Sequence, residues 1–263
     1  MASNPFEVEA IPRRVMPLIF MVDTSGSMGG AKIAQLNTTV RESLNEVGEI
    51  SKNNADAQIK VAALEFSSDV QWMYPQLEDS ESFKWQDLQA GGLTSFGAAL
   101  NELNNKLSRS HGFMSEPKGT RAPAIILLSD GEPTDEYKHA LEKIKGNPWF
   151  KIAVKVAIAI GDDANRDVLA EFTGNIEAVI TVHDTDQLKK IIHVVSVTSS
   201  MVASQSSSLT TSQTPNGTTS VVADPQKQVV DNIQNTISSD PSLAGVDQGS
   251  STANAGTDDW GNW

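Results

Sequence analysis

Five oxygen-bearing side chains occur where the sequence could build a metal site. Asp23, Ser25 and Ser27 alternate directly after an apolar run, Thr94 lies just after a glycine pair, and Asp130 follows a second apolar run. Carboxylate and hydroxyl oxygens are hard donors, and hard donors select hard divalent cations. The set therefore predicts a magnesium site, with manganese or calcium as alternatives.

The donor types also indicate what such a site could do. Three hydroxyls and two carboxylates neutralise little of a cation's charge, so a bound cation could still attract an acidic group from outside. The chain has no cysteine, and none of its four histidines has metal-ligand spacing to another. Thiolate chemistry and cysteine-ligated zinc are therefore excluded.

The amino-acid composition restricts the classes of molecule that this chain is expected to bind. The chain of 263 residues has 20 basic and 33 acidic side chains and a net charge of −13, which argues against nucleic acid and anionic membranes as partners. Its apolar runs are far shorter than the ~20 residues of a membrane helix. The first residues lack the charged-then-apolar layout of a secretory signal, so the sequence predicts a cytoplasmic protein.

The elements that must position these residues alternate between strands and helices. Strands are expected at 15–22, 59–66, 70–74, 124–128, 151–160 and 178–182, and helices at 32–52, 95–107, 137–145, 166–172 and 185–202. This alternation predicts an α/β fold: a doubly wound (Rossmann-like), mostly parallel six-stranded sheet with one antiparallel edge strand and helices on both faces. If the strands at 15–22 and 124–128 are neighbours, Asp23 and Asp130 lie side by side where ligands bind in such sheets.

The expected domain organisation has three parts. Residues 1–12 form an N-terminal extension and 13–200 a single domain, and residues 201–263 form an acidic tail rich in Ser, Thr and Asn. The tail has little aliphatic content, so most of it is expected to be disordered. A short helix is expected at 224–238, where Asp224-Pro225 precedes apolar residues at helical spacing.

The ordered set of motifs resembles the metal-ion-dependent adhesion site of von Willebrand factor A domains. The matching segments are Asp23-x-Ser25-x-Ser27, Thr94 in its glycine-rich loop, and Ser129-Asp130-Gly131. The resemblance implies that Ser25, Ser27 and Thr94 bind the cation directly, and that Asp23 and Asp130 bind it directly or through water. It also implies a non-enzymatic module in which a Glu or Asp of a partner protein completes the metal shell.

A finer resemblance concerns residues 128–135, which read LSDGEPTD. This stretch is similar to bacterial tellurium-resistance-type A-domain proteins. The similarity implies a role in a stress-response system, with a PP2C-like phosphatase and a protein kinase as partners.

Three other interpretations of these features stay open. Asp23 and the serines could simply cap the following helix. Ser27 could be the nucleophile of a serine hydrolase, with Asp162 and His183 following in the required order. Alternatively, the globular domain could be a scaffold, with the helix at 224–238 and the terminal Trp260 and Trp263 recruiting partners.

Overall fold

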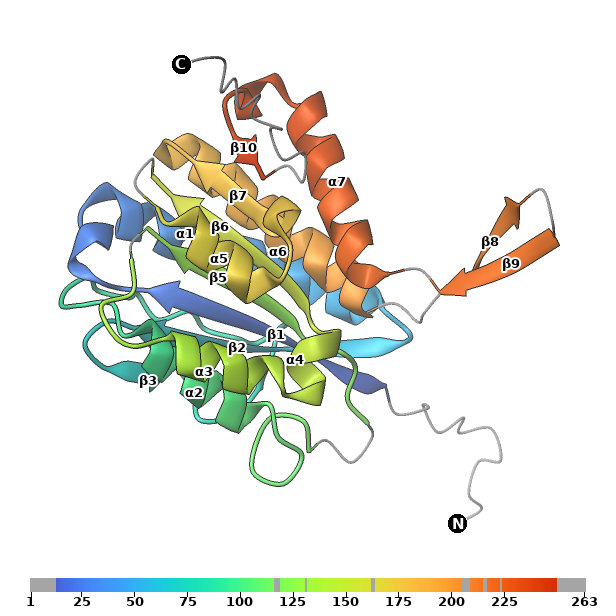
Figure 1. The fold of residues 1–263 in the computed structure, drawn as a ribbon, viewed down its shortest axis with the longest axis horizontal. Coiled ribbons are helices and arrows are strands. Elements are labelled where there is room, and N and C mark those ends of the chain that lie inside the picture. Colours follow the sequence, from blue (N-terminus) through green and yellow to red (C-terminus); the bar gives the residue numbers. More distant parts are fainter. Residues whose placement is uncertain are drawn as a thin grey trace, which may run out of the picture.

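A central sheet lies between two layers of helices (Figure 1). The computed structural model describes residues 13–115, 119–130, 132–161, 164–204, 209–214, 217–222 and 224–249. Trp260 and Trp263 lie outside these ranges. The arrangement confirms the predicted α/β fold with a mostly parallel sheet and helices on both faces.

The sheet has eight strands in the order β10-β7-β6-β5-β1-β2-β3, with β4 also paired to β2. Their bounds are Arg14–Asp23 (β1), Ala57–Phe66 (β2), Val70–Trp72 (β3), Glu78–Asp79 (β4), Ala124–Ser129 (β5), Val154–Ile160 (β6), Val179–Val182 (β7) and Asp247–Gln248 (β10). The five strands from β7 to β2 are parallel. The expected count of six is corrected to eight, and antiparallel strands occur at both edges. Both β4 and β10 have only two residues, too few for an alternating pattern to show in the sequence.

Helices cover both faces of the sheet. Their bounds are Ala31–Asn53 (α1), Phe96–Lys106 (α2), Lys138–Lys145 (α3), Pro148–Ile152 (α4), Arg166–Thr173 (α5), Thr185–Ser204 (α6) and Pro225–Ser239 (α7). The apolar sides of α1, α6 and α7 pack on one face, and those of α2 to α5 pack on the other. The strand expected at 151–160 begins only at Val154, because Asn147 caps the short helix α4 by accepting a hydrogen bond from the Trp149 amide (2.9 Å).

The chain after residue 200 contributes to the fold. A two-stranded hairpin, Leu209–Thr214 (β8) with Gly217–Val222 (β9), connects α6 to α7 and lies apart from the sheet in Figure 1. The expected helix at 224–238 is present as α7, and its Val229, Val230 and Ile233 are buried. The polar composition after residue 200 predicts a largely disordered tail, whereas α7 and β10 complete the core and one edge of the sheet. Among the described residues, no helix is both long and apolar enough to cross a bilayer.

Candidate metal centre

The candidate site lies at the carboxyl end of the sheet, where the strand order reverses. The chain runs from β1 to β2 on one side and reaches β5 on the other, so β1 and β5 are parallel neighbours with Val22 opposite Leu128. Such reversal points are where open α/β sheets bind ligands. Asp23 ends β1 and Ser129 ends β5, so the predicted acidic residues meet at this edge.

Hydrogen bonds join the Asp-x-Ser-x-Ser loop to the residues after β5. The Asp23 carboxylate accepts from the Ser25 amide (2.8 Å) and from the Ser129 hydroxyl (2.7 Å). The Ser25 and Ser27 hydroxyl oxygens are 3.0 Å apart, and the Ser27 hydroxyl donates to Asp130 Oδ1 (2.8 Å). Four of the five predicted ligands are thus connected through their side chains or the adjacent backbone.

The loop that carries Thr94 is bonded to the same edge. Backbone hydrogen bonds join Gly26 N to Gly92 O (3.2 Å) and Gly91 N to Thr24 O (2.8 Å). Thr94 itself is only 6% exposed, whereas the preceding Leu93 is 60% exposed. Leu93, which separates the glycine pair from Thr94, therefore bulges outward and leaves Thr94 buried at the edge of the sheet.

A second set of contacts fixes that loop. The Thr94 amide donates to the Thr134 hydroxyl (3.0 Å), and the Thr134 amide donates to Thr94 O (2.9 Å). Gly92 has a φ of +81°, and a Cβ there would lie 2.5 Å from Ser68 Oγ, so a side chain at this position would be strained and would displace the Ser68 hydroxyl. Within the described residues no hydrogen bond engages the Thr94 hydroxyl, which leaves it available as a ligand.

The two carboxylates of the site are buried away from water, where a negative charge is costly. Asp23 is fully buried, and this burial is the largest effect on its carboxyl and raises the pKa. Hydrogen bonds from Ser25 and Ser129 lower that pKa, and the nearby charge of Asp130 raises it further. The Asp130 side chain is also fully buried and forms an ion pair with Lys32. Buried carboxylates need a compensating positive charge, so the site is suited to a cation.

The donor set fits a hard divalent ion. Within the described part of the chain, no three His, Cys, Asp or Glu side chains cluster in a way that could hold a metal. Any ion at this edge would therefore rely on hydroxyls beside Asp23 and Asp130, which suits magnesium, manganese or calcium better than a soft metal. Asp135 is committed elsewhere, because it accepts hydrogen bonds from the amides of Gly97 and Ala98 at the start of α2.

The structure bears on two of the alternative interpretations. Helix α1 begins after Gly30, and Ser25 precedes a short 3-10 turn without a side-chain capping bond, so these serines do not cap the helix. The Ser27 hydroxyl contacts Ser25 and Asp130, and no histidine bonds to it among the described residues. Asp162, the expected acid of a hydrolase, lies outside the described residues.

Two residues of the site were missed by the sequence analysis. Ser129, the first residue of the third motif, donates a hydrogen bond to Asp23. Lys32, near the start of the first predicted helix, pairs with Asp130, which lies 98 residues away in the sequence. The sequence signal for Lys32 was a lone cation in the first turn of a helix, where the helix dipole disfavours positive charge.

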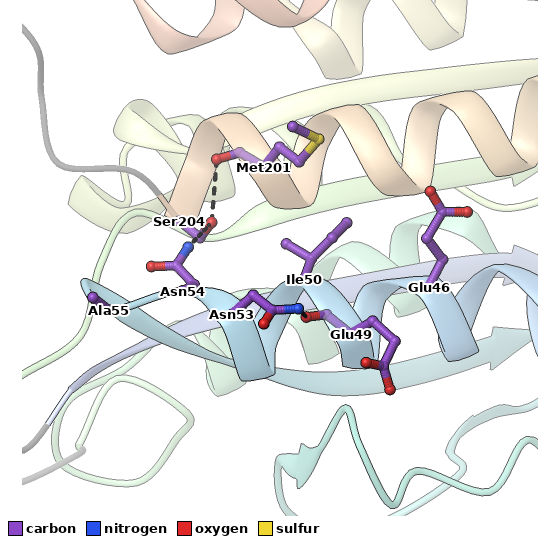
Figure 2. Close-up of a pocket in the computed structure, with 8 residues that line it drawn as sticks. All are labelled: Glu46, Glu49, Ile50, Asn53, Asn54, Ala55, Met201 and Ser204. Carbon is purple, nitrogen blue, oxygen red and sulfur yellow. Dashed lines mark hydrogen bonds between the residues drawn. The ribbon is translucent and has the colours of Figure 1, made fainter.

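The hollow in Figure 2 lies far from this centre, between the C-terminal ends of α1 and α6. Its volume is about 460 Å³, and its lining includes Glu46, Glu49, Ile50 and Met201. It is about 30 Å along α1 from the first turn of that helix, at 1.5 Å per residue. The Asn54 side chain bridges the two helices by donating to Ser204 Oγ (2.6 Å), so this region serves the packing of α1 on α6.

Comparisons with known proteins agree with this geometry. The family model for the von Willebrand factor type A domain matches residues 18–194. The human collagen alpha-6(VI) chain is 26% identical over 180 residues, which cover 66% of this chain but only 7% of the collagen chain.

Solved structures show the same fold. Proximal thread matrix protein 1 from the mussel byssus, with a zinc-occupied MIDAS motif, matches with a TM-score of 0.53 and 18% identity over 72% of this chain and 48% of that one. A von Willebrand factor type A protein from Catenulispora acidiphila matches with a TM-score of 0.51 and 18% identity. The match covers 71% of this chain and 43% of that protein's chain. This chain thus spans less than half the length of either structure. The family match, the reversal of strand order at β1 and β5, and the ordered motifs together place this chain in the von Willebrand factor type A domain family.

Proposed function

We propose that this chain is a protein-binding module that holds a divalent cation, magnesium in the first instance, and engages an acidic side chain of a partner protein. The observation that carries the proposal is the hydrogen-bonded group of Asp23, Ser25, Ser27 and Asp130 at the carboxyl end of the sheet, with two fully buried carboxylates. Domains of this family are often metal-dependent interaction modules, and the zinc-occupied motif of the mussel protein supports a divalent cation at such a site.

Each residue of the site has a distinct role in this proposal. Ser25, Ser27 and Thr94 would bind the cation through their hydroxyls, and Asp23 and Asp130 would bind it directly or through water. The cation would supply a positive charge and an open coordination position for an incoming carboxylate. Ser129 orients Asp23 by donating a hydrogen bond to its Oδ2.

The charge of the whole chain explains why a cation would control binding. With a net charge of −13, the protein repels an acidic partner at long range. Without the cation, the site offers an incoming carboxylate no free positive charge, because Lys32, the basic side chain at the site, is paired with Asp130. An acidic partner is therefore expected to bind only when the site is filled.

Calorimetric titration of magnesium into the chelator-treated chain of 263 residues tests the metal site. Wild-type protein should bind one magnesium ion, and Thr94→Ala should weaken binding at least about tenfold, since removing even an outer-shell partner costs that much. Ser95→Ala is the matched control: Ser95 is the next residue, its hydroxyl bonds to Ser68 O (3.3 Å), and it is no part of the donor set. Equal affinities for wild type and Thr94→Ala would refute the proposed ligand set.

The cellular setting is a further part of the proposal. We propose that the protein acts in the cytoplasm, in a stress-response system of the tellurium-resistance type. Its proposed partners there are a PP2C-like phosphatase and a protein kinase. The similarity of residues 128–135 to tellurium-resistance-type A-domain proteins supports this assignment. Affinity capture in magnesium and in chelator, with wild type and Asp23→Ala, tests it. Such a phosphatase or kinase should be retained only by wild type in magnesium, and equal retention in chelator would contradict the proposal.

A further inference from the structure

Lys32 occupies an unusual place in the site. It lies in the first turn of α1, and its ammonium group forms an ion pair with Asp130 Oδ2. The other oxygen of Asp130 accepts the Ser27 hydroxyl at 2.8 Å. Both oxygens of a proposed metal ligand are therefore engaged within the chain itself.

The local structure shows that this lysine is held against its helical preference. The dipole of α1 places partial positive charge at its N-terminus, where a lysine is unfavourable and an acidic residue is preferred. The first turn of α1 contains no acidic residue. The ion pair with Asp130 compensates this unfavourable position.

The burial of the pair is strongly asymmetric. The Asp130 side chain is 0% exposed, and the Lys32 side chain is 31% exposed. Because Lys32 reaches the site from the solvent side, it can withdraw into water without unfolding the helix. Asp130 has no such freedom, since it is enclosed and bonded to Ser27.

We propose that Lys32 is an internal counter-ion of the site, which must release Asp130 when a divalent cation binds. Two positive charges cannot share a buried carboxylate without mutual repulsion. Lys32 therefore lowers the affinity for the cation and stabilises the metal-free protein. The inference rests on the proposed function, since it assumes that the site binds a divalent cation.

The test compares magnesium affinity and metal-free stability in the same variants. Lys32→Met keeps the apolar stem and removes the charge, and Lys32→Gln keeps a hydrogen-bond donor near Asp130. Both variants should bind magnesium at least tenfold more tightly than wild type in calorimetry. In chelator, Lys32→Met should melt at a lower temperature than wild type, because Asp130 loses its counter-ion, and saturating magnesium should remove that deficit.

Lys52→Met is the matched control. It removes one lysine from the same helix and changes the net charge equally, and its partner Glu49 lies away from the site. Its magnesium affinity should stay within about twofold of wild type, since screening weakens effects over such distances.

The possible results separate the two proposals. Unchanged or weaker magnesium binding in Lys32→Met and Lys32→Gln, with normal binding by wild type, would overturn the role of Lys32 and leave the proposed function intact. Absence of magnesium binding in wild type and in both variants would overturn the proposed function and this inference together.

Discussion

Replacing Gln226 by alanine should detach the start of α7 from the sheet. The Gln226 side chain bonds to both backbone groups of Lys155: Lys155 N donates to its Oε1 and its Nε2 donates to Lys155 O, each at 2.7 Å. Strand β6 pairs with β7 only from Ala157 onward. Gln226 therefore occupies the place of a neighbouring strand at the uncovered start of β6.

The expected loss follows from these two contacts. Each hydrogen bond contributes about 1 kcal/mol net, and a buried amide left without a partner costs about 1–3 kcal/mol. Gln226→Ala should therefore lower the free energy of unfolding by about 2–3 kcal/mol. For a domain of this size, that corresponds to a decrease in Tm of about 4–12 °C.

Thermal and urea denaturation of the full chain measure this change, with Gln228→Ala as the control. Gln228 lies two residues further along α7, and its side chain makes no hydrogen bond among the described residues, so its replacement should cost less than about 0.5 kcal/mol. If the two variants have the same stability, the two contacts of Gln226 do not stabilise the start of β6, and this reasoning is refuted.

Three further substitutions test the buried charges and the packing near the site. Asp23→Asn should abolish magnesium binding without lowering the metal-free Tm at pH 7: burial raises the pKa of Asp23, so the contribution of its carboxyl to stability is present below about pH 3.9 and is lost as the pH rises through the folded-state pKa. Melting in chelator at pH 7 and pH 4 measures this, and a lower Tm for Asp23→Asn at pH 7 would contradict it. Burial lowers the pKa of Lys155, so wild type should gain stability relative to Lys155→Met as the pH rises from 7 to 10, and a gap in urea stability that does not change with pH would refute this. Gly97→Ala should destabilise the fold by about 1–3 kcal/mol, because a Cβ there lies 2.9 Å from Glu136 O and from Tyr137 Cα; an unchanged Tm would show that this loop can move away.

The central strands, and the closeness of Asp23 to Asp130, could be predicted from the sequence because buried strands have a clear apolar pattern. Residues 15–22 and 124–128 are continuous apolar runs, as expected for strands buried on both faces, and each ends in polar residues. The structure buries both runs fully and pairs them in parallel. Long, strongly patterned elements carry enough information to be located from local sequence alone.

Contacts between distant polar residues could not be predicted in the same way. The pairing of Lys32 with Asp130 and the capping of β6 by Gln226 join residues 98 and 71 positions apart. Neither contact produces a periodic pattern in the sequence, because each depends on a single side chain that contacts a single residue of another element. Strand β10 was missed for a related reason: its two residues carry no pattern of their own, and they pair with β7, a strand far away in the sequence.

Anomalous diffraction from crystals of the full chain grown with manganese shows directly whether these five residues hold a divalent cation. We expect one manganese peak in direct contact with the hydroxyls of Ser25, Ser27 and Thr94, beside the carboxylates of Asp23 and Asp130, and a loss of that peak when magnesium is added in excess. An anomalous map with no peak at these residues, or with manganese bound only elsewhere on the acidic surface, would contradict it.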